Sequence, residues 1–270
     1  MAEIVEDLLR ADGIIDIAIK KDIKKQLSNI GVQRGMLLLV DADCEALGYI
    51  SGGAQTLIDA LMETVGYDGT IVMPAFTLDN LDPACHGSAK ISRENWDLIR
   101  NSARPFNRKL TPPGTKDALV HQFLRNEGVI RSYHPLYSFA AWGKYAKVIC
   151  DKHPLHFGLS KDSPLGKCSE LNGFVFLAGC SYDQCTMFQL ARYSGDHLPI
   201  KILSAPIEQN TSMIWKDMLD LELDHRGFDV IGEVMEERKI VKNMYINAAR
   251  CRFFSAREAV NIATAYFHIN

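Results

Sequence analysis

The sequence has no apolar run long enough to cross a bilayer. Its longest apolar runs, "MLLLV" at 36–40 and "FVFLAGC" at 174–180, fall well short of the roughly 20 residues that a transmembrane helix needs. The acidic start "MAEIVEDLLRADG" lacks the basic residues and the apolar stretch of a secretion signal. We therefore expect a soluble, cytoplasmic protein with no membrane partner.

An excess of one charge, internal repeats and a regular cysteine pattern are also absent. The net charge of −3 over 270 residues gives no basic field for nucleic acid. The seven cysteines are odd in number and scattered, which favours reduced thiols over a disulfide framework. The chain is 47% hydrophobic and long enough for a full core, and no linker divides it, so we expect one domain over residues 1–270.

The short motifs of several enzyme classes are missing as well. The chain has no G-x-S-x-G, no P-loop and no G-x-G-x-x-G. The sequence therefore gives no motif that indicates a serine hydrolase, a nucleoside-triphosphate-binding protein or a dinucleotide-binding protein. His153 and His156 could bind a metal together only on a helix, and Pro154 between them favours a turn. Cys180 and Cys185 have no second cysteine pair with which to complete a zinc site. We expect no metal site.

What the chain does contain is an alternation of buried strands and amphipathic helices. The segments 36–43 and 70–77 are predicted strands, and a helix predicted over 52–69 connects them, which indicates a parallel β-α-β unit of an α/β protein. The proline-rich stretch 78–118 is predicted to be an irregular excursion, a kind of loop that is often functional. Further strands are predicted at 137–143 and 173–180, one or two strands at 211–225, and helices at 20–32, 93–100, 116–128, 228–239 and 255–267.

Two glycines, Gly52 and Gly53, open the helix predicted over 52–69. Glycines at a helix start let an anion approach the free backbone N–H groups closely. The same glycines are equally explained if they only turn the chain. The spacing alone leaves both interpretations open.

Three segments resemble the signature segments of the aminoglycoside 3-N-acetyltransferase family. They are "GYISGGAQTLIDALMETVGYDGTIVMPAFT" at 48–77, "RSYHPLYSFAAWGKYA" at 131–146 and "FGLSKDSPLGK" at 157–167. The resemblance runs from about residue 20 to the C-terminus and keeps order and spacing. It implies a three-layer α/β/α sandwich with a mixed, largely parallel sheet. It also implies acetyl transfer from acetyl-CoA to a small-molecule amine, and the sequence leaves a homodimer open.

The catalytic positions of that family are replaced in this sequence. The family pattern T-x-x-H-x-x-E appears here as Thr186, Gln189 and Arg192. The family's His would accept the amine proton and its Glu would support that His. Gln189 cannot accept a proton at any useful pH, and Arg192 is a permanent cation. The family's H-S-S is Asp41-Ala42-Asp43 here, and a family Glu is Gln122.

Three functions remain open. The first is an acyl-CoA-dependent N-acyltransferase with a modified site, whose acceptor is less expected to be an aminoglycoside because acidic positions have changed. The second is an inactive family member that keeps a CoA-binding cleft, and the third is an acyltransferase that uses a cysteine. His134 either caps its loop or replaces the missing base, and Arg131 either holds the loop or contacts the acceptor.

The candidate residues are Gln189, Arg192, His134 and Cys185 for catalysis, Asp41, Ala42, Asp43, Gly52, Gly53, Thr77 and Ser163 for acetyl-CoA or CoA, and Gln122, Arg131 and Thr186 for the acceptor.

Overall fold

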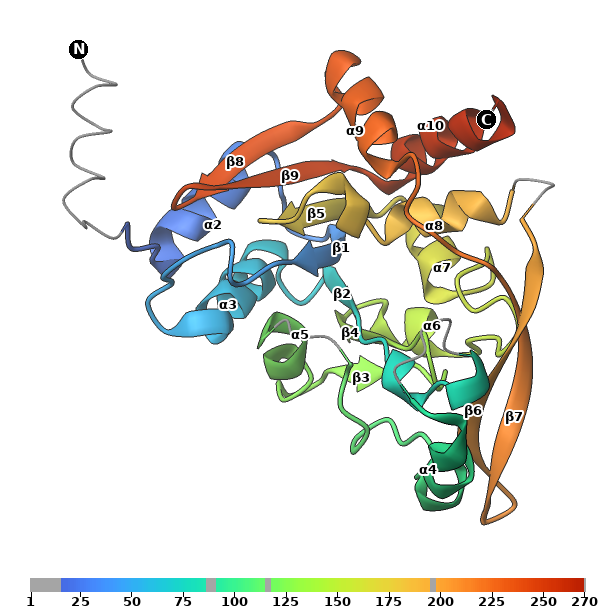
Figure 1. Cartoon of the computed structure of the whole chain (residues 1–270). Helices are drawn as coiled ribbons and strands as arrows, with labels where there is room; N and C mark the ends of the chain where they lie inside the picture. Colours follow the sequence, from blue (N-terminus) through green and yellow to red (C-terminus); the bar gives the residue numbers. More distant parts are fainter. Residues whose placement is uncertain (1–15, 86–90, 115–117, 195–197, 270) are drawn as a thin grey trace.

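A computed structural model describes residues 16–85, 91–114, 118–194 and 198–269 (Figure 1). These residues form a seven-stranded sheet in the order β3-β4-β2-β1-β5-β9-β8 and a separate two-stranded sheet of β6 and β7. The strands are β1 Leu37–Ala42, β2 Thr70–Pro74, β3 Ile130–Arg131, β4 Phe139–Gly143, β5 Phe174–Ala178, β6 Ile200–Gln209, β7 Ser212–Leu221, β8 Lys242–Ile246 and β9 Ala249–Ser255.

Helices cover both faces of the large sheet, which confirms the predicted three-layer architecture (Figure 1). On β1, Leu38 packs in a core with the helices α2 and α3, whereas Leu39 packs in a second core with α7 and α8. This alternation follows from the two-residue period of a strand. The helices are α2 Lys20–Asn29, α3 Gly53–Val65, α4 Trp96–Ser102, α5 Ala118–Phe123, α6 Ala146–Cys150, α7 Pro164–Glu170, α8 Met187–Arg192, α9 Phe228–Glu237 and α10 Ala256–Ile269.

The sheet is mixed, as expected, but its parallel part is narrower than the expected "largely parallel" sheet. The strands β2, β1 and β5 run parallel to one another, which confirms the predicted β1-α3-β2 unit. On both flanks the pairing is antiparallel, through β4 and β3 on one side and β9 and β8 on the other. The carboxyl ends of the three central strands therefore meet at one edge of the sheet.

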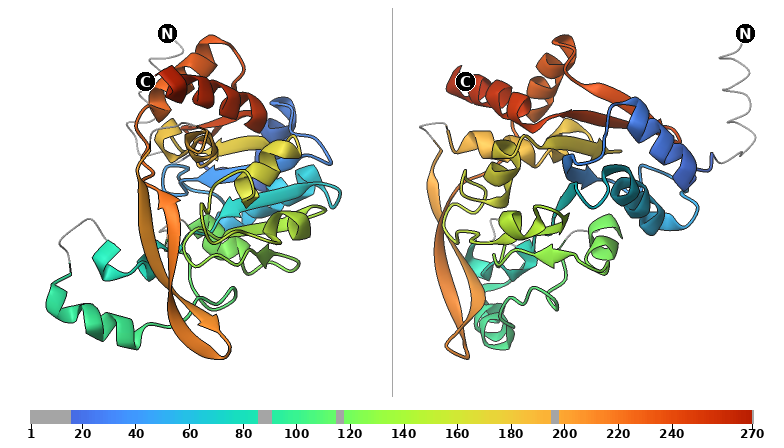
Figure 2. Two further views of the ribbon diagram at one scale, coloured as in Figure 1. Left: turned by 90° about the vertical axis from the view of Figure 1, so that its right-hand side faces the viewer. Right: turned by 180° about the vertical axis from the view of Figure 1, so that it is seen from behind.

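The hairpin of β6 and β7 stands at the side of the sheet, next to the excursion that carries α4 (Figure 2). The stretch predicted at 211–225 forms a single strand, β7, and its partner β6 was not predicted. Pro206 lies inside β6, and proline argues against a strand except at an edge, where β6 lies. Backbone hydrogen bonds from Asp82 to Ser204 and from Phe106 to Pro206 attach the excursion to β6.

The excursion over 78–118 contains short helical turns, and α5 is shorter than expected. The turns are η1 Leu78–Asn80, η2 Pro83–Cys85 and η3 Arg93–Asn95, which leads into α4, while η4 Tyr182–Gln184 precedes α8. The helix predicted over 116–128 ends at Phe123, where the Asn126 side chain donates a 2.9 Å hydrogen bond to the Gln122 carbonyl. Residues 116 and 117 lie outside the described part. No helix in the described ranges is long and apolar enough to cross a membrane.

Candidate functional site

A cleft opens where β1, β2 and β5 end, the position at which open α/β sheets keep their ligand sites. It consists of two cavities of about 240 Å³ and 440 Å³ that share Phe76, Gln184 and Thr186. The first cavity, here called the strand-end cavity, lies over β1 and β2. The second, here called the hairpin cavity, extends toward β6 and the loop after β7 and is lined by Gln189, Leu203 and His225 among others.

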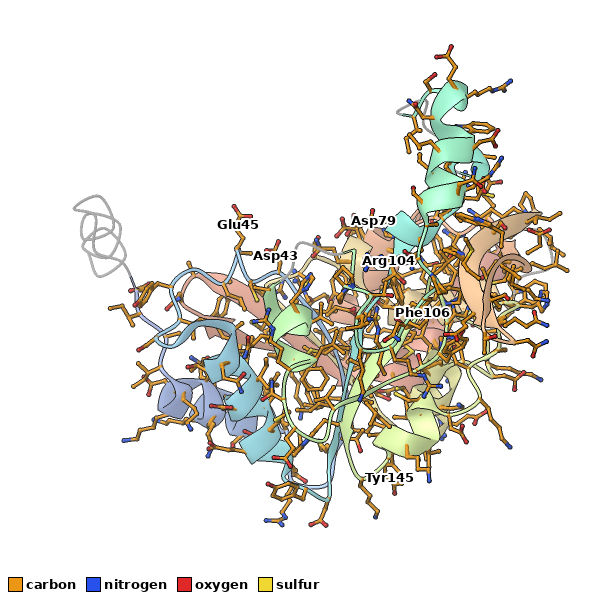
Figure 3. The ribbon with its side chains drawn as sticks, turned by 90° about the horizontal axis from the view of Figure 1, so that it is seen from below. Asp43, Glu45, Asp79, Arg104, Phe106 and Tyr145 are labelled. Atoms are coloured by element: carbon orange, nitrogen blue, oxygen red, sulfur yellow. The ribbon has the colours of Figure 1, made fainter. Side chains whose placement is uncertain are left out.

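Carboxylates stand along the edge at which the cleft opens. Figure 3 shows Asp43, Glu45 and Asp79 at one edge of the molecule and Tyr145, which follows β4, at the opposite edge. Asp43 and Glu45 follow β1, and Asp79 follows β2. Asp183 belongs to the lining of the hairpin cavity. The same lining contains Lys201 and His225, so the hairpin cavity presents both acidic and basic side chains to a ligand.

Asp41 fixes the start of α8 at the wall shared by the two cavities. It is buried at the end of β1, and its carboxylate accepts hydrogen bonds from the Thr186 hydroxyl at 2.6 Å and from the Thr186 N–H at 3.0 Å. The next residue, Ala42, lines the strand-end cavity. The Asp43 carboxylate accepts hydrogen bonds from the N–H groups of Glu45 and Ala46 and so shapes the turn after β1.

The two glycines lie at a groove between α3 and α5. Gly52 and Gly53 have φ angles of 86° and 66°, in the left-handed region that favours glycine. Gly52, Gln122 and Arg125 line the groove, and the Gln122 amide donates a 2.8 Å hydrogen bond to Gln55 on α3. Because Leu119 and Val120 of α5 line the strand-end cavity, the same helix borders both spaces.

Thr77 and Ser163 use their hydroxyls to hold the chain. Thr77 donates a 2.6 Å hydrogen bond to the Pro135 carbonyl, and Ser163 caps α7 by accepting from the Leu165 N–H. Both side chains are buried, and neither belongs to the lining of the strand-end or the hairpin cavity. That Thr77 and Ser163 contact acetyl-CoA stays a prediction.

Arg131 and His134 hold the loop before β4. Arg131 donates hydrogen bonds to the Ser138 hydroxyl, to the Thr111 carbonyl and to the Ala75 carbonyl, and it is 4% exposed. His134 is 1% exposed; its Nδ1 accepts from the N–H groups of residues 136 and 137, and its Nε2 donates to the carbonyl of residue 155. The only basic lone pair of His134 is therefore occupied. The alternative that His134 replaces the missing base does not fit this geometry, because a base needs a free lone pair.

A second buried histidine, His153, makes the fold sensitive to acid. Its Nε2 donates to the Gly158 carbonyl at 2.7 Å, and its Nδ1 accepts from the Ser132 hydroxyl. Burial lowers the pKa of His153 to about 4 and also lowers the pKa of His134, whose ring centroid lies 4.8 Å away. Both imidazoles are therefore held neutral in the folded chain.

We expect the free energy of unfolding to decrease as the pH falls from about 6.5 toward 4. An unfolded histidine takes up its proton near pH 6.5, whereas folded His153 resists protonation until about pH 4, so the unfolded state gains protons first. Urea unfolding at pH 7 and pH 5 measures this effect. His153→Gln should reduce the pH dependence of the free energy of unfolding. His268→Gln should leave it unchanged, because His268 is an exposed residue of α10. Equal stability at both pH values in the wild type would show that His153 is not held neutral.

Cys185 does not fit the role of an acyl carrier. It is fully buried at the end of η4, and burial raises the pKa of its thiol, with a further contribution from the Asp41 charge. A reactive cysteine needs a lowered pKa and access to solvent. Within the described residues, no group of three or more His, Cys, Asp or Glu side chains is placed to hold a metal ion.

Gln189 and Arg192 both contact the loop between β7 and α9. Gln189 is 6% exposed and lines the hairpin cavity; its Nε2 donates to the Asp224 carbonyl at 3.3 Å, and its Oε1 has no hydrogen-bond partner among the described residues. Arg192 donates to the Asp224 carboxylate at 2.5 Å and to the Arg226 carbonyl at 2.6 Å, and it stacks on Phe267. Arg192 therefore pairs with a carboxylate and does not line either cavity.

Sequence reasoning missed four polar residues of the hairpin cavity, which are Asp183, Gln184, Lys201 and His225. Gln184 stands within the polar stretch after β5, so its neighbourhood was recognised but the residue was not. Lys201 depends on the unpredicted strand β6. His225 follows "LELD", just after the end of β7. The change there from apolar to polar residues is the sequence signal that could have indicated a site residue.

The comparisons with known proteins agree with this architecture. The family model described as aminoglycoside 3-N-acetyltransferase matches residues 39–268. The SPbeta prophage-derived aminoglycoside N(3')-acetyltransferase-like protein YokD of Bacillus subtilis is 36% identical over 92% of this chain and 92% of its own length. The aminoglycoside N(3)-acetyltransferase IX of Micromonospora chalcea is 29% identical over 77% of this chain and 74% of its own.

Solved structures agree over nearly the whole chain. The crystal structure of the YokD protein from Bacillus subtilis has a TM-score of 0.91 and 36% identity, with coverage of 96% of both chains. The crystal structure of aminoglycoside acetyltransferase AAC(3)-Xa has a TM-score of 0.87 and 27% identity, with coverage of 98% of both chains. The chain therefore belongs to the aminoglycoside 3-N-acetyltransferase family.

Proposed function

We propose that this protein transfers an acetyl group from acetyl-CoA to a small amine bound in the hairpin cavity. The observation that carries the proposal is the cleft at the carboxyl ends of β1, β2 and β5, in a chain of a family described by acetyl transfer. The hairpin cavity, at about 440 Å³, lies in the range of small-molecule sites.

Acetyl-CoA is proposed to enter along α5. The groove that contains Gly52 and Arg125 offers a left-handed glycine at the start of α3 and an exposed guanidinium for the phosphates. The thioester would then reach the strand-end cavity, which Leu119 and Val120 of the same helix border. Thr186 stands at the wall that both cavities share, between the donor and the acceptor.

The acceptor amine is proposed to be held by Gln189. The Oε1 atom of this buried residue lacks a partner among the described residues, and an unpaired buried acceptor costs about 1–3 kcal/mol. An N–H group of a bound amine would remove that cost. The resemblance aligns Gln189 and Arg192 with the family's His and Glu, so the proposed reaction depends on positioning and on a proton acceptor other than residue 189.

The proposal is tested by amine-dependent thiol release from acetyl-CoA. The panel contains a simple primary amine, a linear diamine and an aminoglycoside, and calorimetry measures the binding of acetyl-CoA in parallel. We expect acetyl-CoA to bind and the small amines to be acetylated faster than the aminoglycoside. Binding without release for any amine would favour the inactive family member, and no binding at millimolar acetyl-CoA would contradict both functions.

A further inference from the structure

Gln189 and Arg192, which the resemblance aligns with the family's His and Glu, converge on one loop residue. Gln189 donates to the backbone carbonyl of Asp224, and Arg192 donates to the carboxylate of the same residue. Asp224 also accepts from the N–H and the side chain of Arg226, which closes the turn between β7 and α9. The helix α8 thus fixes the position of this turn through two side chains.

The turn that α8 fixes carries a histidine at the hairpin cavity. His225 lines the cavity together with Gln189, and its ring stacks on Phe228 with a centroid distance of 5.3 Å and an interplanar angle of 8°. Phe228 is itself fully buried and lines the same cavity. His225 is exposed, so a proton that it accepts can pass to solvent.

Among the described residues that line the hairpin cavity, His225 alone has an imidazole. The other ionisable side chains there suit the role less well. They include the carboxylate of Asp183, the amine of Lys201 and the thiol of Cys185, and burial raises the pKa of that thiol. His134 and His153 have both ring nitrogens in hydrogen bonds with the protein. An imidazole is the side chain that most readily exchanges a proton near neutral pH.

We propose that His225 is the general base of this protein, supplied by the β7–α9 loop in place of the base that is missing at position 189. The inference rests on the proposed acetyl transfer. The amine first releases the proton of its cationic form to solvent; its neutral nitrogen then attacks the thioester carbonyl and forms the new C–N bond, while His225 takes the second proton that this nitrogen loses. The C–S bond then breaks, and the CoA thiolate leaves and is protonated by the imidazolium or by solvent. Arg192 and Asp224 act as positioning residues, because they contact the loop and not the acceptor.

The test compares His225→Ala with His268→Ala, an exposed histidine on α10 that lies outside the cleft. With the amine that the wild type acetylates fastest, we expect His225→Ala to lower kcat by about 10²-fold, the lower end for a general base. The KM for acetyl-CoA should change by less than about two-fold, because the thioester groove is untouched. Added imidazole should restore part of the lost rate in His225→Ala and leave the wild type unchanged.

The outcomes separate this inference from the proposed function. An active wild type with His225→Ala within about two-fold of it would overturn the inference and leave acetyl transfer in place. A rate loss that imidazole does not restore, with a raised KM for the amine, would assign His225 a binding role and also overturn it. A wild type that binds acetyl-CoA but acetylates no amine would overturn the proposed function, and the inference with it.

Discussion

Arg192→Glu should lower the free energy of unfolding by about 3 kcal/mol, the lower end of the range for breaking a buried ion pair, because Arg192 is buried but Asp224 is only partly buried. The Arg192 side chain is 9% exposed and donates to the Asp224 carboxylate at 2.5 Å. A glutamate there would place two carboxylates together and would remove the cation from the face of Phe267, whose ring centroid lies 3.8 Å from the guanidinium carbon. Urea unfolding at pH 7 measures the change.

The matched control changes the other arginine that Asp224 contacts. The Arg226 side chain is 83% exposed, so Arg226→Glu should cost less than about 1 kcal/mol, as exposed ion pairs do. The exchange of both charges, Arg192→Glu with Asp224→Arg, should recover part of the lost stability, because the two groups interact directly. If Arg192→Glu and Arg226→Glu had the same small effect, the ion pair would not hold the β7–α9 loop.

This result bears on attempts to rebuild the family pattern in this chain. The sequence suggests Gln189→His with Arg192→Glu as the restoring pair of changes. The structure places position 192 against Asp224, so a glutamate there meets a carboxylate before it can support a histidine. Residues 192 and 224 are 32 apart in the chain, so the spacing of residues in the sequence could not reveal that their side chains are in contact.

Asp41→Ala should have the second large effect, on both stability and turnover. The buried carboxylate holds the N–H and the hydroxyl of Thr186, and hydrogen bonds to a charged group contribute about 1.5–3 kcal/mol each. We expect a loss of about 3 kcal/mol, and kcat at least about 10-fold lower, since Thr186 forms the wall between the proposed donor and acceptor positions.

Asp43→Ala is the control for this change, because Asp43 also follows β1 and accepts from two backbone N–H groups. Its turn is exposed to solvent, so its loss should lower the free energy of unfolding by only about 1 kcal/mol. Thermal unfolding and amine-dependent thiol release measure the two effects. Equal losses for Asp41→Ala and Asp43→Ala would contradict the role given to Asp41.

The central part of the fold could be predicted because its signals are local. The strands β1 and β2 are short apolar runs, and the helix between them, Gly53–Val65 with Gly66 as its cap, lies within the predicted range 52–69. The hairpin could not be predicted, since Pro206 weakens the strand signal of β6 and the pairing with β7 forms a separate sheet. One wall of the hairpin cavity depends on that hairpin and was therefore missed.

The candidate site was predicted in its location but less well in its residues. Asp41 lines the cleft because it lies near the end of β1, and Thr186 and Gln189 line it because they belong to the start of α8, the helix after β5. Thr77, Ser163 and Arg131 were predicted as contacts of the ligands, yet their hydrogen bonds go to loops of the protein. A polar residue next to a strand end has two possible partners, ligand or backbone, and sequence alone does not show which one it takes.

The most direct test of acetyl transfer is a single turnover with protein in excess over acetyl-CoA that is labelled in the acetyl group. The labelled products are separated after incubation with a small primary amine. The account predicts that the label appears in the amide of the amine, and that it appears at least about 10²-fold more slowly with His225→Ala. Label that stays in the thioester, or that is found on a cysteine of the protein, would contradict it.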